Sequence, residues 1–260
     1  MNRRLLITGA GGFLGSRICE YYSNRDGYEA VGVTHRELDI EDFVAVSAFI
    51  KAIRPDYVLH CAAISNTGTC ERNPVLSEKV NVRGTINLAK ACRNAGSRMI
   101  FTSSDQIYNT SHSLEPNREG SEGKPGNVYG RDKKRAEEAM LTYLPDAVAL
   151  RLTWMYDAPS RGRAAGQGLL QKLADALKER REVEFPVHDY RGITYVWEVV
   201  RHLEEAMGLP GGVYNFGSEN RYNTFDTARL FLRELAGSDS GGILKRNDER
   251  FASCPRNLTM

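Results

Sequence analysis

The sequence predicts an α/β protein built on a Rossmann-type, doubly wound parallel sheet. Apolar runs of strand length alternate with amphipathic segments of helix length from the first residues to about residue 153. Strands that are apolar along both faces and separated by helices are typical of a parallel sheet, because the crossover helices cover both of its faces. A glycine-rich turn follows the first of these strands, as it does in many doubly wound folds.

The predicted elements follow one another in a regular order. Leu14, Ile18 and Tyr22 share one face of the first helix-length segment. Pro55 stops the second such segment and Gly96 ends the third. Strands are expected at residues 4–9, 28–34, 57–63, 98–104 and 147–153, and helices at residues 13–24, 41–54, 75–96 and 128–144.

Other segments are less regular. Residues 105–127 are polar and rich in Gly, Pro, Ser and Glu, which predicts a long loop. Beyond Trp154 we expect a loop at 157–168, a helix at 169–180, and short strands and helices to about Gly237. Residues 241–260 show no helical pattern, so we expect a loop there, or a chain that stops short of the end of its fold. These patterns predict a main domain over residues 1–154 and a smaller, interleaved part over residues 155–260.

Composition excludes several classes of function. The 260 residues include 35 basic and 33 acidic ones, and no block of Lys or Arg stands apart, so no nucleic-acid partner is expected. The five cysteines are scattered without a C-x-x-C pair or a ligand spacing, which predicts reduced thiols and no metal site. The apolar run after Arg4 is too short for a signal peptide or a membrane span. We therefore expect a cytoplasmic protein without a membrane partner.

The glycine-rich turn has the pattern G-x-x-G-x-x-G at Gly9, Gly12 and Gly15, with Gly11 between them. In a strand-turn-helix unit the first glycine allows the tight turn, the middle ones let the backbone approach a pyrophosphate, and the last lets the helix pack on the strand. The helix N-terminus adds free N–H groups and the positive end of its dipole. The turn therefore predicts a dinucleotide site; the alternative is a purely structural turn.

The tip of the second strand bears on the choice of dinucleotide. An acidic residue there hydrogen-bonds the free 2′-hydroxyl of NAD. This chain has Thr34, His35 and Arg36 at that position, and the planar guanidinium of Arg36 could bind a 2′-phosphate. The residues favour NADP(H) over NAD(H). Glu37 lies only one residue further, and Arg36 could instead be a solvated surface charge.

Tyr129 is the only tyrosine followed four residues later by a lysine, Lys133. On a helix the two side chains share one face, and a nearby cation is expected to lower the pKa of the phenol. Such a tyrosine can give a proton to a carbonyl oxygen while a hydride reaches the carbon. Ser103 or Ser104, at the end of the preceding strand, could hold the same oxygen. The alternatives are a half-buried Tyr beside a surface Lys, and serines that cap the following loop.

These three elements, in this order, resemble the short-chain dehydrogenase/reductase superfamily, and "TGAGGFLG" is the pattern of its extended branch. The segments "LDIED", "HCAAIS", "NVRGTINLAKAC", "FTSSDQIY", "NVYGRDK", "LRLTWMY", "GITYV" and "GVYNFGSE" are similar to the dTDP-4-dehydrorhamnose reductase family. The resemblance runs from about Leu5 to Gly237. Ser103-Ser104-Asp105 stands for the family's Ser-Thr-Asp, and Cys254-Pro255 stands for its Arg-Pro.

The resemblance implies a role for each matching residue. Five residues of the turn would hold the pyrophosphate: Gly9, Gly12, Phe13, Leu14 and Gly15. Asp39 and Ile40 would contact the adenine, and Ala62 and Ala63 the ribose and nicotinamide side. Ser104 would polarise the substrate carbonyl, Tyr129 would donate the proton, and Lys133 would bind the nicotinamide ribose. Ser104, Asp105 and Trp154 would contact the substrate, although Trp154 could equally be a core residue.

The function that the resemblance implies is NADP(H)-dependent reduction of a nucleotide-linked keto-sugar, by a protein that could form a homodimer. Two alternatives remain. A tightly retained NAD would suit an epimerase or dehydratase of the same branch, and some relatives, such as the regulatory subunit of methionine adenosyltransferase, are non-catalytic binding partners.

Overall fold

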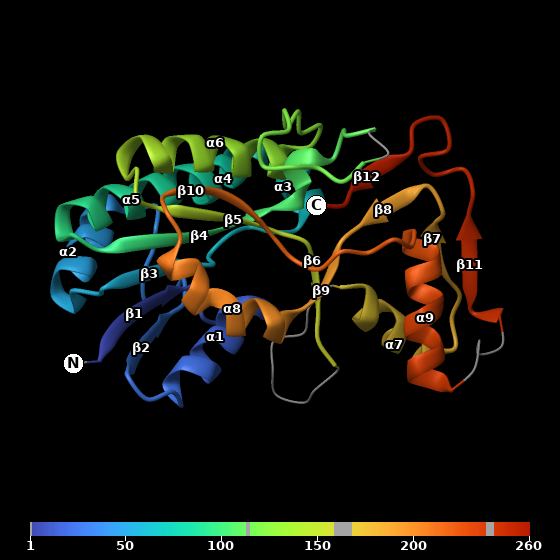
Figure 1. Cartoon of the computed structure of the whole chain (residues 1–260), viewed down its shortest axis with the longest axis horizontal. Helices are drawn as coiled ribbons and strands as arrows, with labels where there is room; N and C mark the ends of the chain where they lie inside the picture. The colour runs from blue at the N-terminus through green and yellow to red at the C-terminus, as the bar shows by residue number, and fades with distance from the viewer. Residues whose placement is uncertain (1, 113–114, 159–167, 238–241) are drawn as a thin grey trace.

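The computed structural model describes residues 2–112, 115–158, 168–237 and 242–260. Its centre is a six-stranded parallel sheet, and the predicted doubly wound fold is confirmed (Figure 1). In spatial order the strands are β10 (Gly212–Phe216), β5 (Val148–Leu152), β4 (Arg98–Ser104), β3 (Tyr57–His60), β1 (Arg3–Thr8) and β2 (Tyr28–Val33). After β2 the chain returns to the other side of β1, so the order reverses between β1 and β3.

Helices cover both faces of the sheet and bury its apolar side chains. One face packs on α2 (Phe43–Ile53), α5 (Gly84–Ala95) and α6 (Val128–Tyr143). The other face packs on α1 (Phe13–Ser23) and α8 (Val196–Gly208). Leu14, Ile18 and Tyr22, the predicted apolar face of α1, are all buried in this second core. The two cores on opposite faces explain why the sheet strands are apolar throughout.

The second part of the molecule has a core of its own. Helices α7 (Leu169–Glu179) and α9 (Thr224–Ala236) enclose an apolar cluster that includes Leu173, Phe185 and Leu232. Short parallel strand pairs frame it. They are β6 (Trp154–Tyr156) with β9 (Ile193–Tyr195), β7 (Val183–Pro186) with β11 (Leu244–Asn247), and β8 (Asp189–Arg191) with β12 (Arg256–Leu258).

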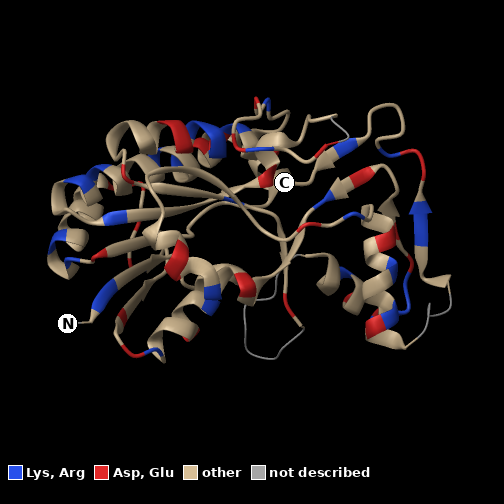
Figure 2. Cartoon of the chain, viewed as in Figure 1, with Lys and Arg blue, Asp and Glu red and all other residues tan. Residues whose placement is uncertain are grey.

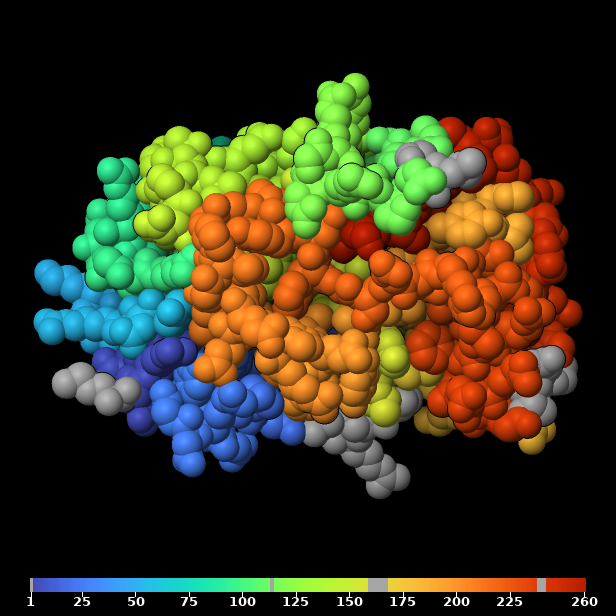
Figure 3. All heavy atoms as spheres, in the orientation of Figure 1, coloured from blue at the N-terminus to red at the C-terminus, as the bar shows by residue number. Residues whose placement is uncertain are grey.

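The chain crosses back to the first part after residue 195. Helix α8 packs beside α1, and β10 pairs with β5 as the outer strand of the sheet. Figure 3 shows this orange segment lying against the blue N-terminal region. Residues 196–216 therefore belong with the first part although they follow Trp154 in the chain. The boundary near Trp154 stays a prediction.

The helix predicted at residues 75–96 is confirmed, with a π-helical turn inside it. It is α4 (Pro74–Glu78), a π-helical turn (Lys79–Arg83) and α5, and it is preceded by a short helix, α3 (Thr67–Arg72). The side chain of Asn81, inside the π turn, binds both the N–H and the carbonyl oxygen of Ile64. This contact between distant residues accounts for the wider turn, because it holds Asn81 towards the end of β3.

Two loop predictions need correction. The predicted loop at 105–127 begins with a 3-10 turn over Asp105–Tyr108, closed by the Ser104 hydroxyl, which accepts a hydrogen bond from the Gln106 N–H. The predicted loop at 241–260 contains β11 and β12. These strands were not recognisable because each is only a few residues long and pairs with a strand far away in the sequence. Most of the predicted loop at 157–168 lies outside the described residues.

Residues of both charge signs occur along the helices of the chain. Figure 2 shows basic and acidic residues interspersed along the helices, with basic residues next to an acidic one at β8 and β12. None of the described helices is long and apolar enough to cross a membrane.

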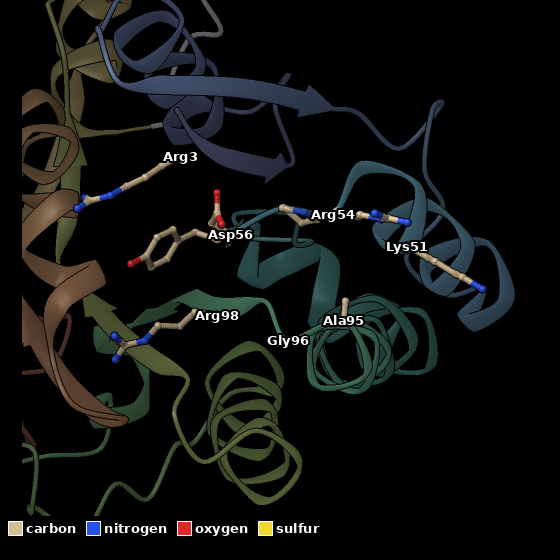
Figure 4. A pocket seen from close by; sticks show the side chains of 9 residues that line it. Arg3, Lys51, Arg54, Asp56, Ala95, Gly96 and Arg98 are labelled. Carbon is tan, nitrogen blue, oxygen red and sulfur yellow. The ribbon is translucent and has the colours of Figure 1, made fainter. Parts of the chain in front are cut away.

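A hollow at the amino edge of the sheet contains several cations, but they do not converge. Lys51 and Arg54 point to one side of it, and Arg3 and Arg98 to the other (Figure 4). Lys51 and Arg54 lie at the C-terminal end of α2, where the helix dipole favours positive charge. Arg98 donates hydrogen bonds to the carbonyl oxygens of Asp146 and Met207. Arg3 pairs with Glu204 at 3.5 Å, so all four cations have structural explanations.

Candidate active site

The glycine-rich turn lies at the carboxyl ends of β1 and β3, where the strand order reverses. Doubly wound sheets bind their ligands at such a switch point. Gly9 has φ +70°, in the left-handed region, and a Cβ there would lie 2.7 Å from the backbone N of Ala62. A larger residue would therefore separate the turn from the end of β3. This contact places Ala62, with Ala63 next to it in sequence, beside the turn.

Helix α1 presents an open N-terminus at this turn. Gly12 is its N-cap and provides no side-chain hydrogen bond, so the first N–H groups of α1 have no side-chain cap. A Cβ at Gly15 would collide with the carbonyl oxygen of Gly9, so the helix packs on the turn with no room for a side chain. The turn and the helix N-terminus leave free N–H groups of the kind that bind a pyrophosphate, and the pyrophosphate contact itself stays a prediction. Phe13 and Leu14 are the first two residues of this helix.

The end of β2 brings both candidate selectors of the dinucleotide to one place. Arg36 is exposed. The carboxylate of Glu37 folds back and accepts hydrogen bonds from the N–H and the hydroxyl of Thr34, both at 2.8 Å. These hydrogen bonds lower the pKa of Glu37, so it is anionic at neutral pH. Since Thr34 lies beside Gly11, an acidic group and a basic group flank the expected adenosine ribose.

Substitution of these two residues should change the cofactor preference in opposite directions. We expect Arg36→Ala to weaken NADPH binding about tenfold and leave NADH binding unchanged, because only NADPH has a phosphate for the guanidinium. Glu37→Gln should weaken NADH and spare NADPH, because it replaces a charged acceptor for the 2′-hydroxyl with a weaker, neutral one. Titration of nicotinamide fluorescence measures both constants. Equal weakening of the two cofactors by Arg36→Ala would contradict the assignment.

Asp39 and Ile40 differ in their surroundings. Ile40 is buried, and a Cβ at Gly84 would lie 2.6 Å from its Cδ1, so it packs tightly on α5. Its carbonyl oxygen accepts a hydrogen bond from the Asn87 amide. Asp39 is exposed, and its carboxylate accepts a hydrogen bond from the N–H of Glu41. The loop after β2 is thus fixed at Ile40, while an adenine contact by either residue stays a prediction.

The predicted serine and tyrosine are brought together at the end of β4. Ser104 is the last residue of β4, and Tyr129 lies in the first turn of α6; both are 8% exposed. Burial and the charge of Asp105 raise the pKa of Tyr129, whereas a hydrogen bond with Ser104 lowers it. The net direction is upward, so the predicted lowering of the Tyr129 pKa by Lys133 is wrong for the protein alone. Desolvation is the largest contribution, because the phenol is buried.

Lys133 lies beneath Tyr129 and is itself 1% exposed. Its Nζ donates a hydrogen bond to the carbonyl oxygen of Thr102 at 2.7 Å and lies 5.7 Å from the centre of the Tyr129 ring. Burial lowers the pKa of Lys133 to about 8. The two side chains share one face of α6 as predicted, but Lys133 is a buried cation rather than a surface one.

We expect Lys133→Met to stabilise the protein while it removes activity. The pKa of Lys133 is about 8 in the folded protein and 10.5 for an unperturbed lysine, as in the unfolded chain. Between these two pH values the unfolded chain binds more protons than the folded one, so the folded state gains stability as the pH rises. The charged side chain therefore costs stability below about pH 8, and this cost disappears as the pH rises. Replacing this charge should raise the free energy of unfolding by about 1–3 kcal/mol at pH 7. The loss of the hydrogen bond to the Thr102 carbonyl oxygen reduces this gain.

Urea denaturation at pH 7 checks this result. Lys134→Met is the matched control, because that lysine is more exposed and donates to the carbonyl oxygen of Gly123. In the wild type, cofactor affinity should also fall as the pH rises through about 8, because Lys133 loses its charge. A lower free energy of unfolding in Lys133→Met would show that the buried charge is not the dominant cost.

Asp105 follows Ser104 and is buried with half of its carboxylate unsatisfied. Its Oδ1 accepts hydrogen bonds from the Ser104 hydroxyl and the Gln106 amide, both at 3.3 Å. Its Oδ2 has no hydrogen-bond partner among the described residues. Burial raises the pKa of Asp105, and the charges of Arg191 and Arg256 lower it. A buried acceptor without a partner is costly, so this oxygen is suited to bind a donor from outside the protein.

Trp154 is half-buried, and two cations lie over its ring. The sequence did not reveal this arrangement. The Arg191 guanidinium lies 4.7 Å and the Lys172 Nζ 5.8 Å from its ring centre. Burial lowers the pKa of Lys172, and the positive charges of Arg191 and Arg250 lower it further, so both guanidinium groups lie near this lysine. Asp189 partly balances them, since its carboxylate pairs with Arg256 at 2.8 Å and Arg191 at 3.3 Å. We call Lys172, Arg191, Arg250 and Arg256 the basic cluster.

Further residues that hold α6, the helix of Tyr129 and Lys133, were also missed. The N–H of Val128, next to Tyr129, donates to the Glu71 carboxylate at 2.7 Å. Ser77 donates to the carboxylate of Asp132 at 2.6 Å, and Asn81 donates to the Ser77 hydroxyl. The sequence gives only a weak signal for these contacts. Glu71, Ser77 and Asn81 are polar residues in a helical segment, but nothing in their spacing links residues 71–81 to residues 128–132.

The order in which the chain provides these groups defines a class of protein. A glycine-rich turn after the first strand, then a strand-end serine, then a Tyr-x-x-x-Lys helix on a doubly wound sheet mark the NAD(P)-dependent oxidoreductases of the extended short-chain dehydrogenase/reductase kind, and this chain is one of that class. More narrowly, it belongs to the family described as the RmlD substrate binding domain, whose model matches residues 3–255.

Two relatives and one solved structure illustrate the family. The dTDP-4-dehydrorhamnose reductase of Mycolicibacterium smegmatis is 31% identical over 92% of this chain and 71% of its own length. Methionine adenosyltransferase 2 subunit beta of Xenopus laevis is 31% identical over 98% of this chain and 78% of that protein. The structure of dTDP-4-dehydrorhamnose reductase from Bacillus anthracis in complex with NADP has a TM-score of 0.85 and 22% identity, over 96% of this chain and 86% of that one. This last likeness concerns the fold.

Proposed function

We propose that the protein reduces a nucleotide-linked keto-sugar at its 4-keto carbon with NADP(H), as relatives named dTDP-4-dehydrorhamnose reductase suggest. The observation that carries the proposal is the convergence of Ser104, Tyr129 and Lys133 at the carboxyl edge of the sheet, beside the glycine-rich turn. NADPH is favoured over NADH through Arg36. Glu37 lies next to Arg36 and could accept a hydrogen bond from the 2′-hydroxyl of NADH, so NADH would be a weaker, second cofactor.

Each catalytic residue has a task that its surroundings explain. Tyr129 is neutral because its pKa is raised, so it holds the proton that a carbonyl oxygen needs. The Ser104 hydroxyl donates its one hydrogen to Asp105 at 3.3 Å; with substrate bound it would donate to the carbonyl oxygen instead and stabilise the charge developing there. Lys133 is held by the Thr102 carbonyl oxygen and would bind the hydroxyls of the nicotinamide ribose. A bound nicotinamide would supply the hydride.

Two features support a sugar that carries phosphate. The unpartnered Oδ2 of Asp105 can accept a hydrogen bond from a sugar hydroxyl next to the reacting carbonyl. Further along the second part of the molecule, the basic cluster offers more positive charge than Asp189 neutralises. A nucleoside diphosphate attached to the sugar would supply the missing negative charge. We therefore place the sugar at Asp105 and the phosphates towards Arg191.

The direct test mixes the protein with NADPH and a panel of nucleotide-linked 4-keto sugars and follows the absorbance of the reduced nicotinamide. We expect oxidation of NADPH with at least one member, and a KM for that sugar that rises in Arg191→Gln. No oxidation with any member would overturn the reductase proposal. NAD that remains bound through purification and is regenerated without net turnover would favour an epimerase or dehydratase.

A non-catalytic role is the second candidate, because one 31% identical relative is named as a subunit of methionine adenosyltransferase. The complete set of Ser104, Tyr129 and Lys133 weighs against this role. The two proposals differ in one measurement. A binding partner would keep its biological effect in a Tyr129→Phe variant that still binds NADPH, whereas an enzyme would lose it.

A further inference from the structure

A buried ion pair connects the cofactor helix to the second part of the molecule. The Arg17 Nε donates to the Oδ2 of Asp157 at 2.7 Å, and their side chains are 3% and 5% exposed. The two residues are 140 positions apart in sequence. Neither is among the residues that the glycine pattern or the Tyr-x-x-x-Lys spacing singles out.

On one side, Arg17 is fastened to the first turn of α1. Its Nη1 donates to the carbonyl oxygen of Phe13 at 2.6 Å, and its guanidinium lies 4.1 Å from the centre of the Phe13 ring. Phe13 is the first residue of α1, directly after the N-cap residue Gly12, which has no side chain to cap the helix. The guanidinium is therefore held at the helix end whose free N–H groups fit a pyrophosphate.

On the other side, Asp157 directly follows β6, which starts at Trp154. The Oδ1 of Asp157 accepts a hydrogen bond from the N–H of Ala158, while Oδ2 accepts from Arg17, so both carboxylate oxygens have fixed partners. Strand β6 pairs with β9, which follows the strand that carries Arg191. One cation thus joins the phosphate end of α1 to the strand that leads to the basic cluster.

Resting on the proposed function, we propose that Arg17 and Asp157 are a positioning pair in which one buried cation is shared by the cofactor pyrophosphate and the substrate-side strand β6. Removing two charges from water is costly, and a buried pair repays this only when its geometry is fixed. Here the fixed geometry holds Trp154 relative to the phosphate end of the cofactor. Neither residue touches the reacting atoms.

The two single substitutions separate this role from simple stabilisation. Asp157→Asn leaves the Arg17 cation without its carboxylate, so we expect NADPH to bind about threefold more tightly or better. Arg17→Gln leaves an unpaired carboxylate near the pyrophosphate, so NADPH should bind more weakly by a similar factor. The double variant should return close to the wild-type constant. A merely structural pair would weaken NADPH binding in both single variants.

The measurement is titration of nicotinamide fluorescence on the full chain, with hydrogen exchange on the same samples. In the wild type we expect NADPH to slow amide exchange at residues 9–15 and at residues 153–158. In both single variants the protection should remain at residues 9–15 and be lost at residues 153–158. Arg4→Gln is the control, because it breaks an ion pair with Glu29 at the far end of β1.

Shifts of the two dissociation constants in the same direction, or unchanged protection of residues 153–158 in both variants, would overturn the inference. Thermal unfolding of each variant shows whether it is folded when it is titrated. The experiment uses cofactor binding alone. If the wild type binds NADPH but reduces no keto-sugar, the proposed function fails while the coupling is still measured.

Discussion

Tyr129→Phe is expected to bind NADPH as the wild type does and to lose turnover by about 10²–10⁴-fold. The substitution removes one oxygen from a buried ring and leaves Ser104 and Lys133 in place. Tyr108, the other phenol close to the end of β4, donates to the Arg118 carbonyl oxygen and to Asn215, so it is not free to replace the lost proton donor. Binding should be preserved, because the pyrophosphate site and the Lys133 ammonium do not depend on the phenolic oxygen.

The change is measured as kcat with the sugar that the wild type reduces, and as the dissociation constant of NADPH. Tyr143→Phe is the matched control. Tyr143 lies at the other end of α6, so this substitution deletes the same atom far from the site. It should keep wild-type turnover. Turnover in Tyr129→Phe within tenfold of the wild type would remove Tyr129 from the mechanism.

The elements that could be predicted are those whose signals are local. The glycine turn, the face of α1 and the span of α6 depend on spacings within a few residues, and the structure reproduces them. The pairing of Tyr129 with Lys133 on one helix face follows from the same short-range geometry. The direction of the Tyr129 pKa did not follow, because it depends on how deeply the phenol is buried.

The features that could not be predicted depend on contacts across the chain. The π-helical turn requires Asn81 to reach Ile64, and β12 requires β8 as its partner. The basic cluster assembles from α7, β8 and the C-terminal segment, so its four cations come from parts of the chain that are far apart in sequence. Glu37 was recognised as a competitor of Arg36, but only the fold shows its carboxylate tied to Thr34.

Glu137→Ala is expected to lower the free energy of unfolding by about 3–5 kcal/mol, because it leaves a buried guanidinium without its carboxylate. Glu137 lies on α6, one turn after Lys133, and its carboxylate accepts three hydrogen bonds from the Nε and Nη2 of Arg151 on β5. The side chains are 2% and 9% exposed. Arg151 also donates to the Tyr108 hydroxyl, which in turn donates to Asn215 on β10. The pair thus fixes the catalytic helix to three other elements.

Urea denaturation compares this variant with two others. Glu29→Ala breaks the exposed pair with Arg4 and should change the free energy of unfolding by less than about 1 kcal/mol. The double variant Glu137→Leu with Arg151→Met should recover much of the loss, because no charge then remains buried and unpaired. If Glu137→Ala were no worse than Glu29→Ala, the pair would not brace α6. The catalytic groups would then depend on Glu71 and Ser77 for their position.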